Sequence, residues 1–210
     1  MSTRIKICGL TRADDMRLAI DEGADYVGLV FADGSPRRVD ESGLDEWLES
    51  ARDGAEVVGV FRDQSLSRVL EIVEHFDLDF VQLHGTEAGD AWKQLPVRLI
   101  ESRIVGEGVP AARFAGAAWA QLLDAGAGSG TSFDWSLAVE LARAERVFLA
   151  GGLDPQTVGD AVRQVRPFAV DVASGTESAP GIKDPERVRA FIQAVRSAAT
   201  PAPPSGEEST

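Results

Sequence analysis

Residues 4–31 read RIKICGLTRADDMRLAIDEGADYVGLVF and decide the fold. An apolar run at 4–8 is followed by an amphipathic stretch near 12–23 and by a second apolar run at 25–31. A short apolar or β-branched run, a polar or glycine-rich turn and an amphipathic stretch, in this order, are typical of a β/α unit. The stretch therefore predicts a strand, a helix and a second strand.

The same alternation continues to the end of the chain. The runs that we interpret as strands lie at 4–8, 25–31, 56–61, 79–84, 97–104, 118–124, 146–150 and 168–172. Helical patterns lie near 12–23, 42–53, 65–76, 86–94, 109–115, 134–143, 155–164 and 184–197. Two of the helices have a marked start, because Asp154-Pro155 and Asp184-Pro185 each place a capping residue before a proline.

Eight such units predict an α/β fold, a closed (β/α)8 TIM barrel at the small end of its size range. Strands that are apolar along their length suit a parallel sheet covered by helices. An open doubly wound sheet is the alternative. It is disfavoured because no Gly-x-Gly-x-x-Gly follows the first strand, so the dinucleotide-binding fingerprint is missing.

Length and composition predict one domain. The chain has 210 residues, of which 44% are hydrophobic and 26% are charged, which suffices for one buried core. We assign residues 1–199 to the barrel. Residues 200–210, TPAPPSGEEST, have the composition of a disordered tail and are expected to lie outside the fold.

The chain is strongly acidic, with 34 acidic and 21 basic residues and a net charge of -13. This charge opposes binding to nucleic acid and to anionic membrane surfaces. No apolar run approaches the roughly 20 residues that span a bilayer, and the N-terminus lacks a secretory pattern, so we expect a cytoplasmic protein. One cysteine and two histidines predict neither an internal disulfide nor a structural metal.

In a barrel of this kind the active site lies at the C-terminal ends of the strands. Reactive side chains and glycines that the sequence places there are Cys8, Arg37, His84, Asp124, Gly151, Gly152, Asp171, Ser174 and Gly175. Each has a structural alternative. These positions nevertheless define the candidate site.

The side chains among them allow two interpretations each. Cys8 is either a small buried residue or, with a pKa lowered by nearby amides or cations, a base. Asp124 is either a turn former or a proton donor whose pKa is raised by partial burial. Arg37 is either solvated or holds a carboxylate with its fork of N–H groups. His84 is either a satisfied residue at the edge of the core or a functional group.

The glycines suggest a phosphate site. Gly151-Gly152 follow the seventh strand, and Ser174-Gly175 follow the eighth. Loops after these two strands commonly bind phosphate in such barrels, since backbone N–H groups can approach the anion closely where no side chain intervenes. Tight turns without a ligand are the alternative.

A series of segments matches a known family in order and spacing. They are Lys6-Ile7-Cys8-Gly9-Leu10-Thr11, Gly23-Ala24-Asp25, Ser35-Pro36-Arg37, Val58-Gly59-Val60-Phe61, Val81-Gln82-Leu83-His84-Gly85, Leu122-Leu123-Asp124, Gly128-Ser129-Gly130, Leu149-Ala150-Gly151-Gly152-Leu153, Val170-Asp171-Val172-Ala173-Ser174-Gly175, Glu177 and Pro180-Gly181-Ile182-Lys183-Asp184. From about Arg4 to Arg196 the chain resembles the phosphoribosylanthranilate isomerases of tryptophan biosynthesis.

The resemblance implies an Amadori rearrangement without a cofactor. N-(5'-phosphoribosyl)anthranilate would become 1-(2-carboxyphenylamino)-1-deoxyribulose 5-phosphate. By the same resemblance, Cys8 would remove the C2' proton, Asp124 would protonate the ribose ring oxygen, and Arg37 would bind the anthranilate carboxylate. His84 and Asp171 are expected to contact the substrate as well.

The resemblance also places the substrate phosphate on amides around Gly151, Gly152, Ser174 and Gly175. Two features depart from the family pattern. Only Ala125-Gly126-Ala127 separate Asp124 from the Gly-Ser-Gly segment, and an alanine stands at 173 where serine is common.

Two other functions stay open. One is a related phosphate-binding barrel enzyme similar to indole-glycerol-phosphate synthase, with Lys6 on the same side of its strand as Cys8. The other is a phosphate-ligand binder without catalysis. The substrate is expected to be a small molecule, and the chain to act as a monomer or a homodimer.

Overall fold

A computed structural model describes residues 2–105, 108–124 and 135–199. The predicted tail at 200–210 and the short loop that follows Asp124 lie outside these residues. Within the described ranges, no helix is both long enough and apolar enough to cross a bilayer.

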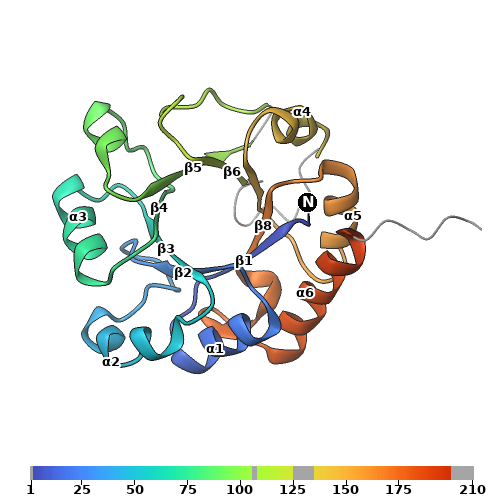
Figure 1. The fold of residues 1–210 in the computed structure, drawn as a ribbon, viewed down its shortest axis with the longest axis horizontal. Coiled ribbons are helices and arrows are strands. Elements are labelled where there is room, and N and C mark those ends of the chain that lie inside the picture. The colour runs from blue at the N-terminus through green and yellow to red at the C-terminus, as the bar shows by residue number, and fades with distance from the viewer. Residues whose placement is uncertain (1, 106–107, 125–134, 200–210) are drawn as a thin grey trace, which may run out of the picture.

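Eight parallel strands form a closed barrel, which Figure 1 shows from one end. They are β1 (Arg4–Cys8), β2 (Tyr26–Val30), β3 (Glu56–Phe61), β4 (Phe80–Leu83), β5 (Arg98–Ile104), β6 (Ala120–Asp124), β7 (Val147–Leu149) and β8 (Ala169–Val172). Each strand pairs with its neighbours in sequence, and β1 pairs with β8, where Lys6 is the register partner of Asp171. The predicted barrel is confirmed.

Helices surround the barrel (Figure 1). They are α1 (Ala13–Glu22), α2 (Glu41–Ala51), α3 (Leu66–His75), α4 (Ser136–Ala144), α5 (Val158–Val165) and α6 (Pro185–Ala199). The predicted cap of α6 is present, since Asp184 Oδ1 accepts hydrogen bonds from the backbone N–H groups of Glu186 and Arg187. Asp154 caps Gln156 and Thr157 in the same way, but α5 begins only at Val158, one turn later.

Two predicted helices were wrong. The segment 86–94 forms only a short 3-10 helix, η1 (Asp90–Gln94), because Gly89 precedes it with φ +108°. The segment 109–115 has no helix, and a turn begins only at residue 113. There the buried carboxylate of Glu101 accepts hydrogen bonds from the backbone N–H of Arg113 at 2.6 Å and of Phe114 at 3.2 Å. A tertiary contact thus replaces the hydrogen bonds that a helix would have made.

Sequence periodicity did not reveal a small hairpin after β8. A 3-10 turn, η2 (Ser174–Thr176), leads into β9 (Glu177–Ala179), which pairs antiparallel with β10 (Ile182–Lys183). Each strand is too short to show an alternating pattern. The hairpin carries Glu177 and Lys183 between the end of β8 and the start of α6.

Two apolar clusters lie within the barrel. At the N-terminal ends of the strands, aromatic rings pack edge to face, and this cluster contains Tyr26, Phe80, Trp119, Phe148 and Phe168. At the opposite end the apolar side chains are smaller: Cys8, Val30, Ala32, Val60 and Ala173. The interior is therefore closed at its aromatic end, and the reactive groups lie at the other end, which we call the mouth.

Candidate active site at the barrel mouth

Alternation along the strands brings the reactive groups to the mouth. Successive side chains of a strand point to opposite faces, so residues two apart share the barrel interior. Lys6 and Cys8 on β1 are related in this way, as are Leu122 and Asp124 on β6. Figure 1 shows β1 and β6 on different sides of the barrel, so Cys8 and Asp124 approach its mouth from different directions.

Cys8 lies in a polar environment although it is buried. Lys6, with no exposed side-chain surface, donates from Nζ to Asp171 Oδ1 at 2.8 Å. Burial raises the pKa of the Cys8 thiol, and the positive charges of Lys6 and Lys183 oppose that rise only in part. In one interpretation of the sequence, nearby cations would lower the pKa of Cys8. The cations are present, but the pKa of the thiol is raised.

The Cys8 sulfur packs over the backbone of β2. A Cβ atom on Gly28 would lie 2.7 Å from Cys8 Sγ, closer than any normal contact. A glycine is therefore required at this position for the thiol to keep its place at the mouth.

His84 and Asp124 form a second group. His84 Nε2 lies 3.5 Å from Asp124 Oδ2, and Gln82 Nε2 lies 3.3 Å from His84 Nδ1. The imidazole ring of His84 therefore lies between the amide of Gln82 and the carboxylate of Asp124. Burial lowers the pKa of His84 despite the charge of Asp124, so the ring is neutral near pH 7.

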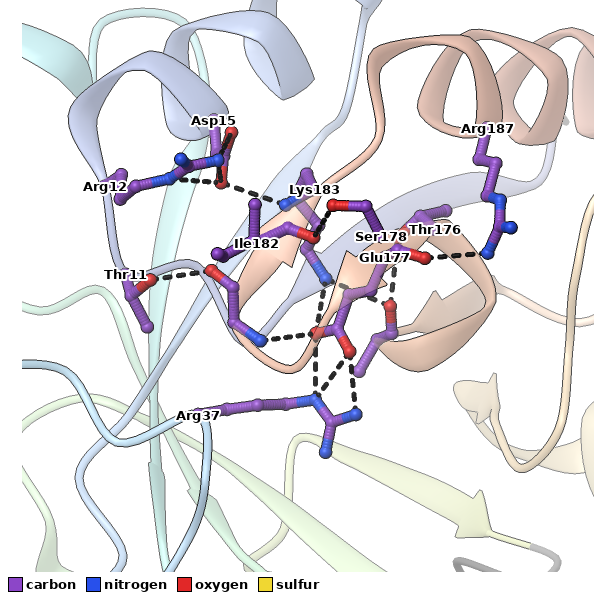
Figure 2. A network of polar contacts seen from close by, with 12 residues as sticks. Thr11, Arg12, Asp15, Arg37, Thr176, Glu177, Ser178, Ile182, Lys183 and Arg187 are labelled. Atoms are coloured by element: carbon purple, nitrogen blue, oxygen red, sulfur yellow. Dashed lines mark hydrogen bonds and ion pairs between the residues drawn. The ribbon is translucent and has the colours of Figure 1, made fainter.

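Arg37 reaches the mouth from the loop after β2. Its Nε and Nη2 atoms donate to Glu177 Oε1 and Oε2 at 2.8 and 2.7 Å, a bidentate pair that Figure 2 shows at the base of the β9–β10 hairpin. The Arg37 stem packs on the residue after Cys8, since a Cβ on Gly9 would lie 2.7 Å from Arg37 Cδ. Arg37 is thus held beside Cys8.

The two predicted phosphate loops are in contact. A Cβ on Gly175 would lie 2.1 Å from the carbonyl oxygen of Leu153, so the loop after β8 packs directly on the loop after β7. Gly151 and Gly152 have φ angles of +88° and +68°, which other residues rarely adopt. Glycines thus permit both the close approach of the loops and their backbone conformations.

The structure gathers the predicted residues into three groups: Cys8 with Asp171, His84 with Asp124, and the two glycine loops with Ser174. Arg37 joins the first group through its packing on Gly9. Sequence reasoning assigned no role to Glu177 and Lys183, although both stand in segments that resemble the family. The sequence feature that could have indicated them is an acidic and a basic residue on either side of the Pro180-Gly181 turn.

The described residues contain no group of three or more His, Cys, Asp and Glu side chains suited to a metal ion. The arrangement offers instead a thiol and a carboxyl at separate points of the mouth, a guanidinium, and two glycine loops. Such a set can move protons on a small molecule that carries negative charges at both ends.

Comparison with known proteins supports this interpretation. The family model described as "PRAI: N-(5'phosphoribosyl)anthranilate (PRA) isomerase" matches residues 5–194. The chain belongs to this isomerase family. A curated N-(5'-phosphoribosyl)anthranilate isomerase of Chromohalobacter salexigens is 40% identical over 202 residues, which cover 92% of this chain and 94% of the relative.

Solved phosphoribosylanthranilate isomerases have the same fold. The enzyme from Thermus thermophilus superposes with a TM-score of 0.82 and 38% identity, covering 93% of this chain and 99% of that one. Another isomerase, in complex with reduced 1-(o-carboxyphenylamino)-1-deoxyribulose 5-phosphate, superposes with a TM-score of 0.79 and 32% identity over 93% of this chain and 99% of that one. The isomerase family match includes all the candidate site residues.

Proposed function

We propose that this isomerase uses Cys8 as general base and Asp124 as general acid to convert N-(5'-phosphoribosyl)anthranilate into the corresponding 1-deoxyribulose 5-phosphate. The observation that carries the proposal is the placement of Cys8 on β1 and Asp124 on β6 at one mouth, beside Arg37 and two glycine loops. The substrate class follows from the family and from these anion-binding groups.

The reaction needs an acid that donates one proton to the substrate and a base that removes another proton from it. Asp124 donates a proton to the ribose ring oxygen as its bond to C1' breaks, and the anthranilate nitrogen forms an iminium with C1'. The iminium makes the C2' proton acidic, and the Cys8 thiolate removes it, leaving an enolamine. A proton then passes from the C2' hydroxyl to C1', which gives the ketone. Each assisted transfer is worth roughly 10²–10⁴ in rate.

Each turnover leaves Asp124 without its proton and Cys8 with an extra one. The proton must return through the solvent-facing mouth before the next cycle. We assign His84 the role of orienting the Asp124 carboxyl group, since its Nε2 lies 3.5 Å from Asp124 Oδ2. Asp171 contributes by holding Lys6, whose charge favours the thiolate of Cys8.

Binding at both ends orients the substrate. We assign the anthranilate carboxylate to Arg37 and the phosphate to backbone amides around Gly151, Gly152, Ser174 and Gly175. The fixed orientation lowers the entropic part of the barrier. Ala173 stands where the family pattern commonly has a serine, so this position offers the phosphate no hydroxyl.

A fluorescence assay tests the proposal. Freshly prepared N-(5'-phosphoribosyl)anthranilate is mixed with the protein, and the fluorescence of the anthranilate group is followed. We expect an enzyme-dependent change; its absence would remove the isomerase assignment. Cys8→Ala and Asp124→Asn should lower kcat by at least about 10²-fold while changing KM far less. Near-normal kcat in either variant would refute the role given to that residue.

A reaction like that of indole-glycerol-phosphate synthase is a weaker candidate. It would need an early-strand lysine free to meet the substrate. Lys6 has no exposed side-chain surface, and its Nζ is bound to Asp171 at 2.8 Å. A phosphate-ligand binder without catalysis is distinguished by the same fluorescence assay, in which it would give no turnover.

We further propose that the enzyme works in the cytoplasm, without nucleic-acid partners, as a monomer or a homodimer. Its net charge of -13 repels an anionic substrate at long range. The attraction must therefore be local, from Arg37 and backbone amides. We interpret the acidic surface as an adaptation to high salt, where the Debye length falls to about 3 Å at 1 M and the repulsion is screened. A nucleotide-composition bias that favours arginine over lysine is the alternative.

A further inference from the structure

Only part of the Arg37 guanidinium forms hydrogen bonds within the described protein. Nε and Nη2 are bound to Glu177, whereas Nη1 makes no hydrogen bond to any residue that the structure describes. The Arg37 side chain is 25% exposed and that of Glu177 is 4% exposed. One edge of the planar guanidinium thus faces Glu177, which leaves the Nη1 side for an external anion.

Glu177 is itself fixed from several sides. Lys183 Nζ, without exposed side-chain surface, donates to Glu177 Oε1 at 3.2 Å and to the Ala173 carbonyl at 3.0 Å. The backbone N–H of Gly181 also donates to Oε1, at 3.3 Å. Burial alone would raise the pKa of Glu177, but the hydrogen bond from Arg37 and the charge of Lys183 outweigh it and lower that pKa. The carboxylate is therefore ionised and immobile.

The hairpin that carries Glu177 is bound to the rest of the mouth. Thr11 Oγ1 donates to the Gly181 carbonyl at 2.6 Å, and the Lys183 backbone N–H donates to Asp15 Oδ2 at 3.0 Å (Figure 2). Arg187 donates to the Glu177 carbonyl at 2.7 Å. The loop after β1, α1 and α6 therefore all fix the position of this hairpin.

We propose that Glu177 is a positioning residue that holds Arg37 so that its Nη1 edge meets the substrate carboxylate, and that it thereby makes the enzyme selective for a substrate with this group. The inference rests on the carboxylate contact that we assign to Arg37. A long arginine side chain adopts many rotamers, and a bidentate partner restricts them before the substrate arrives.

Glu177 also lies close in sequence to the loop that we assign to the phosphate. Only Gly175 and Thr176 separate it from Ser174 in the phosphate loop. Thr176 is fully buried, and its hydroxyl donates to the Ala173 carbonyl at 3.0 Å. The groups assigned to the two ends of the substrate are thus connected by one short, hydrogen-bonded segment, which fixes the distance between them.

Substitution of Glu177 by glutamine separates positioning from simple electrostatic attraction. Arg37, Lys183 and Glu177 together carry one net positive charge, and Glu177→Gln raises it to two. If attraction alone mattered, the variant would bind an anionic substrate more tightly. If positioning matters, the variant binds it more weakly, because a glutamine cannot accept both hydrogen bonds of the guanidinium fork. The two models predict changes of opposite sign.

The experiment compares two substrates, the phosphoribosyl derivatives of anthranilate and of aniline, which lacks the carboxylate. For Glu177→Gln we expect KM for the anthranilate substrate to rise by about tenfold, with kcat and the aniline KM changed less than about twofold. Arg37→Lys keeps the charge but cannot form the bidentate pair, so it should raise the same KM. The double variant should show no further increase, since Glu177 acts through Arg37.

Glu22→Gln is the matched control, because Glu22 forms a 2.7 Å pair with Arg189 between α1 and α6, and it should leave both KM values unchanged. A lower or unchanged anthranilate KM in Glu177→Gln, or equal increases for both substrates, would overturn the inference. Should Glu177→Gln fail to fold, Glu177→Asp takes its place: it keeps the charge but shortens the side chain that holds Arg37, so the anthranilate KM alone should again rise, and unchanged KM values would overturn the inference. A different result would refute the assignment of Arg37 itself: equal wild-type KM values for the anthranilate and aniline substrates, together with unchanged KM values in Arg37→Ala.

Discussion

Single residues at the mouth are defined by their charged neighbours. Cys8 would be an inert buried thiol without Lys6, and Lys6 would be an uncompensated buried charge without Asp171. The sequence predicted Cys8 and Asp124 as reactive groups because their strands end there. It could not predict that Asp171 binds Lys6, because that contact depends on the closure of β8 onto β1, 165 residues apart.

The raised pKa of Cys8 has a kinetic consequence. In the proposed mechanism Cys8 must be deprotonated and Asp124 protonated, so kcat/KM should have a bell-shaped dependence on pH, and the inflection that reports Cys8 should lie above that of an ordinary thiol. The charge of Lys6 and its hydrogen bond lower the pKa of Cys8, so Lys6→Met should move this inflection to higher pH. The measurement is the pH dependence of kcat/KM in the fluorescence assay. A Cys8 inflection that stays in place or moves to lower pH in Lys6→Met would contradict this account.

Secondary-structure elements followed sequence periodicity wherever the pattern was long. The helix predicted at 65–76 appears as α3, with Ser65 Oγ as its cap. The prediction at 86–94 failed because of a local feature, the backbone conformation of Gly89, and the prediction at 109–115 failed because of a tertiary contact with the buried Glu101 carboxylate. The β9–β10 hairpin escaped prediction because its strands are two and three residues long.

The contact between the β7 and β8 loops predicts a sharp response to one added methyl group. Gly175→Ala would place a Cβ 2.1 Å from the Leu153 carbonyl, so the two loops must separate. We expect a loss of about 1–3 kcal/mol in the free energy of unfolding and a raised KM, because the amides that we assign to the phosphate would move apart. Thermal unfolding and steady-state kinetics measure these effects.

Gly159→Ala is the matched control for this prediction. It makes the same substitution within α5, where the nearest atoms belong to the flexible end of Arg163 at 3.4 Å. Alanine favours a helix over glycine by up to about 1 kcal/mol, so stability should hold or increase and KM should not change. Equal behaviour of the two variants would show that the loop contact is unimportant.

At the scale of the whole molecule, the hydrophobic pattern predicts the fold and the net charge does not. The eight-unit barrel was predictable because every unit repeats the same hydrophobic pattern, whereas the surface charge carries no information about the fold. Only three of the 21 basic residues are lysines, and Lys6 and Lys183 are both buried in the site. Apart from Lys93, the surface cations are therefore arginines.

The acidic surface predicts a dependence of stability on salt. With a net charge of -13, self-repulsion destabilises the folded chain at low ionic strength, and salt screens it. We expect the midpoint of thermal unfolding to rise as KCl is increased from low to multimolar concentration. Matched measurements in sucrose would reveal any general effect of a cosolute. A midpoint that does not change with KCl would leave composition bias as the explanation of the charge.

The aromatic cluster at the far end of the barrel has a consequence for turnover. Tyr26, Phe80 and Phe148 fill the interior there, and Arg4 and Arg98 lie over their outer rings. Product must therefore depart by the same opening through which substrate arrives. Because rearrangement leaves the carboxylate and the phosphate unchanged, the product keeps both groups that we assign to Arg37 and to the glycine loops, and its departure competes with the next arrival. Tight anchoring thus accelerates the chemistry but slows the exchange of one molecule for the next.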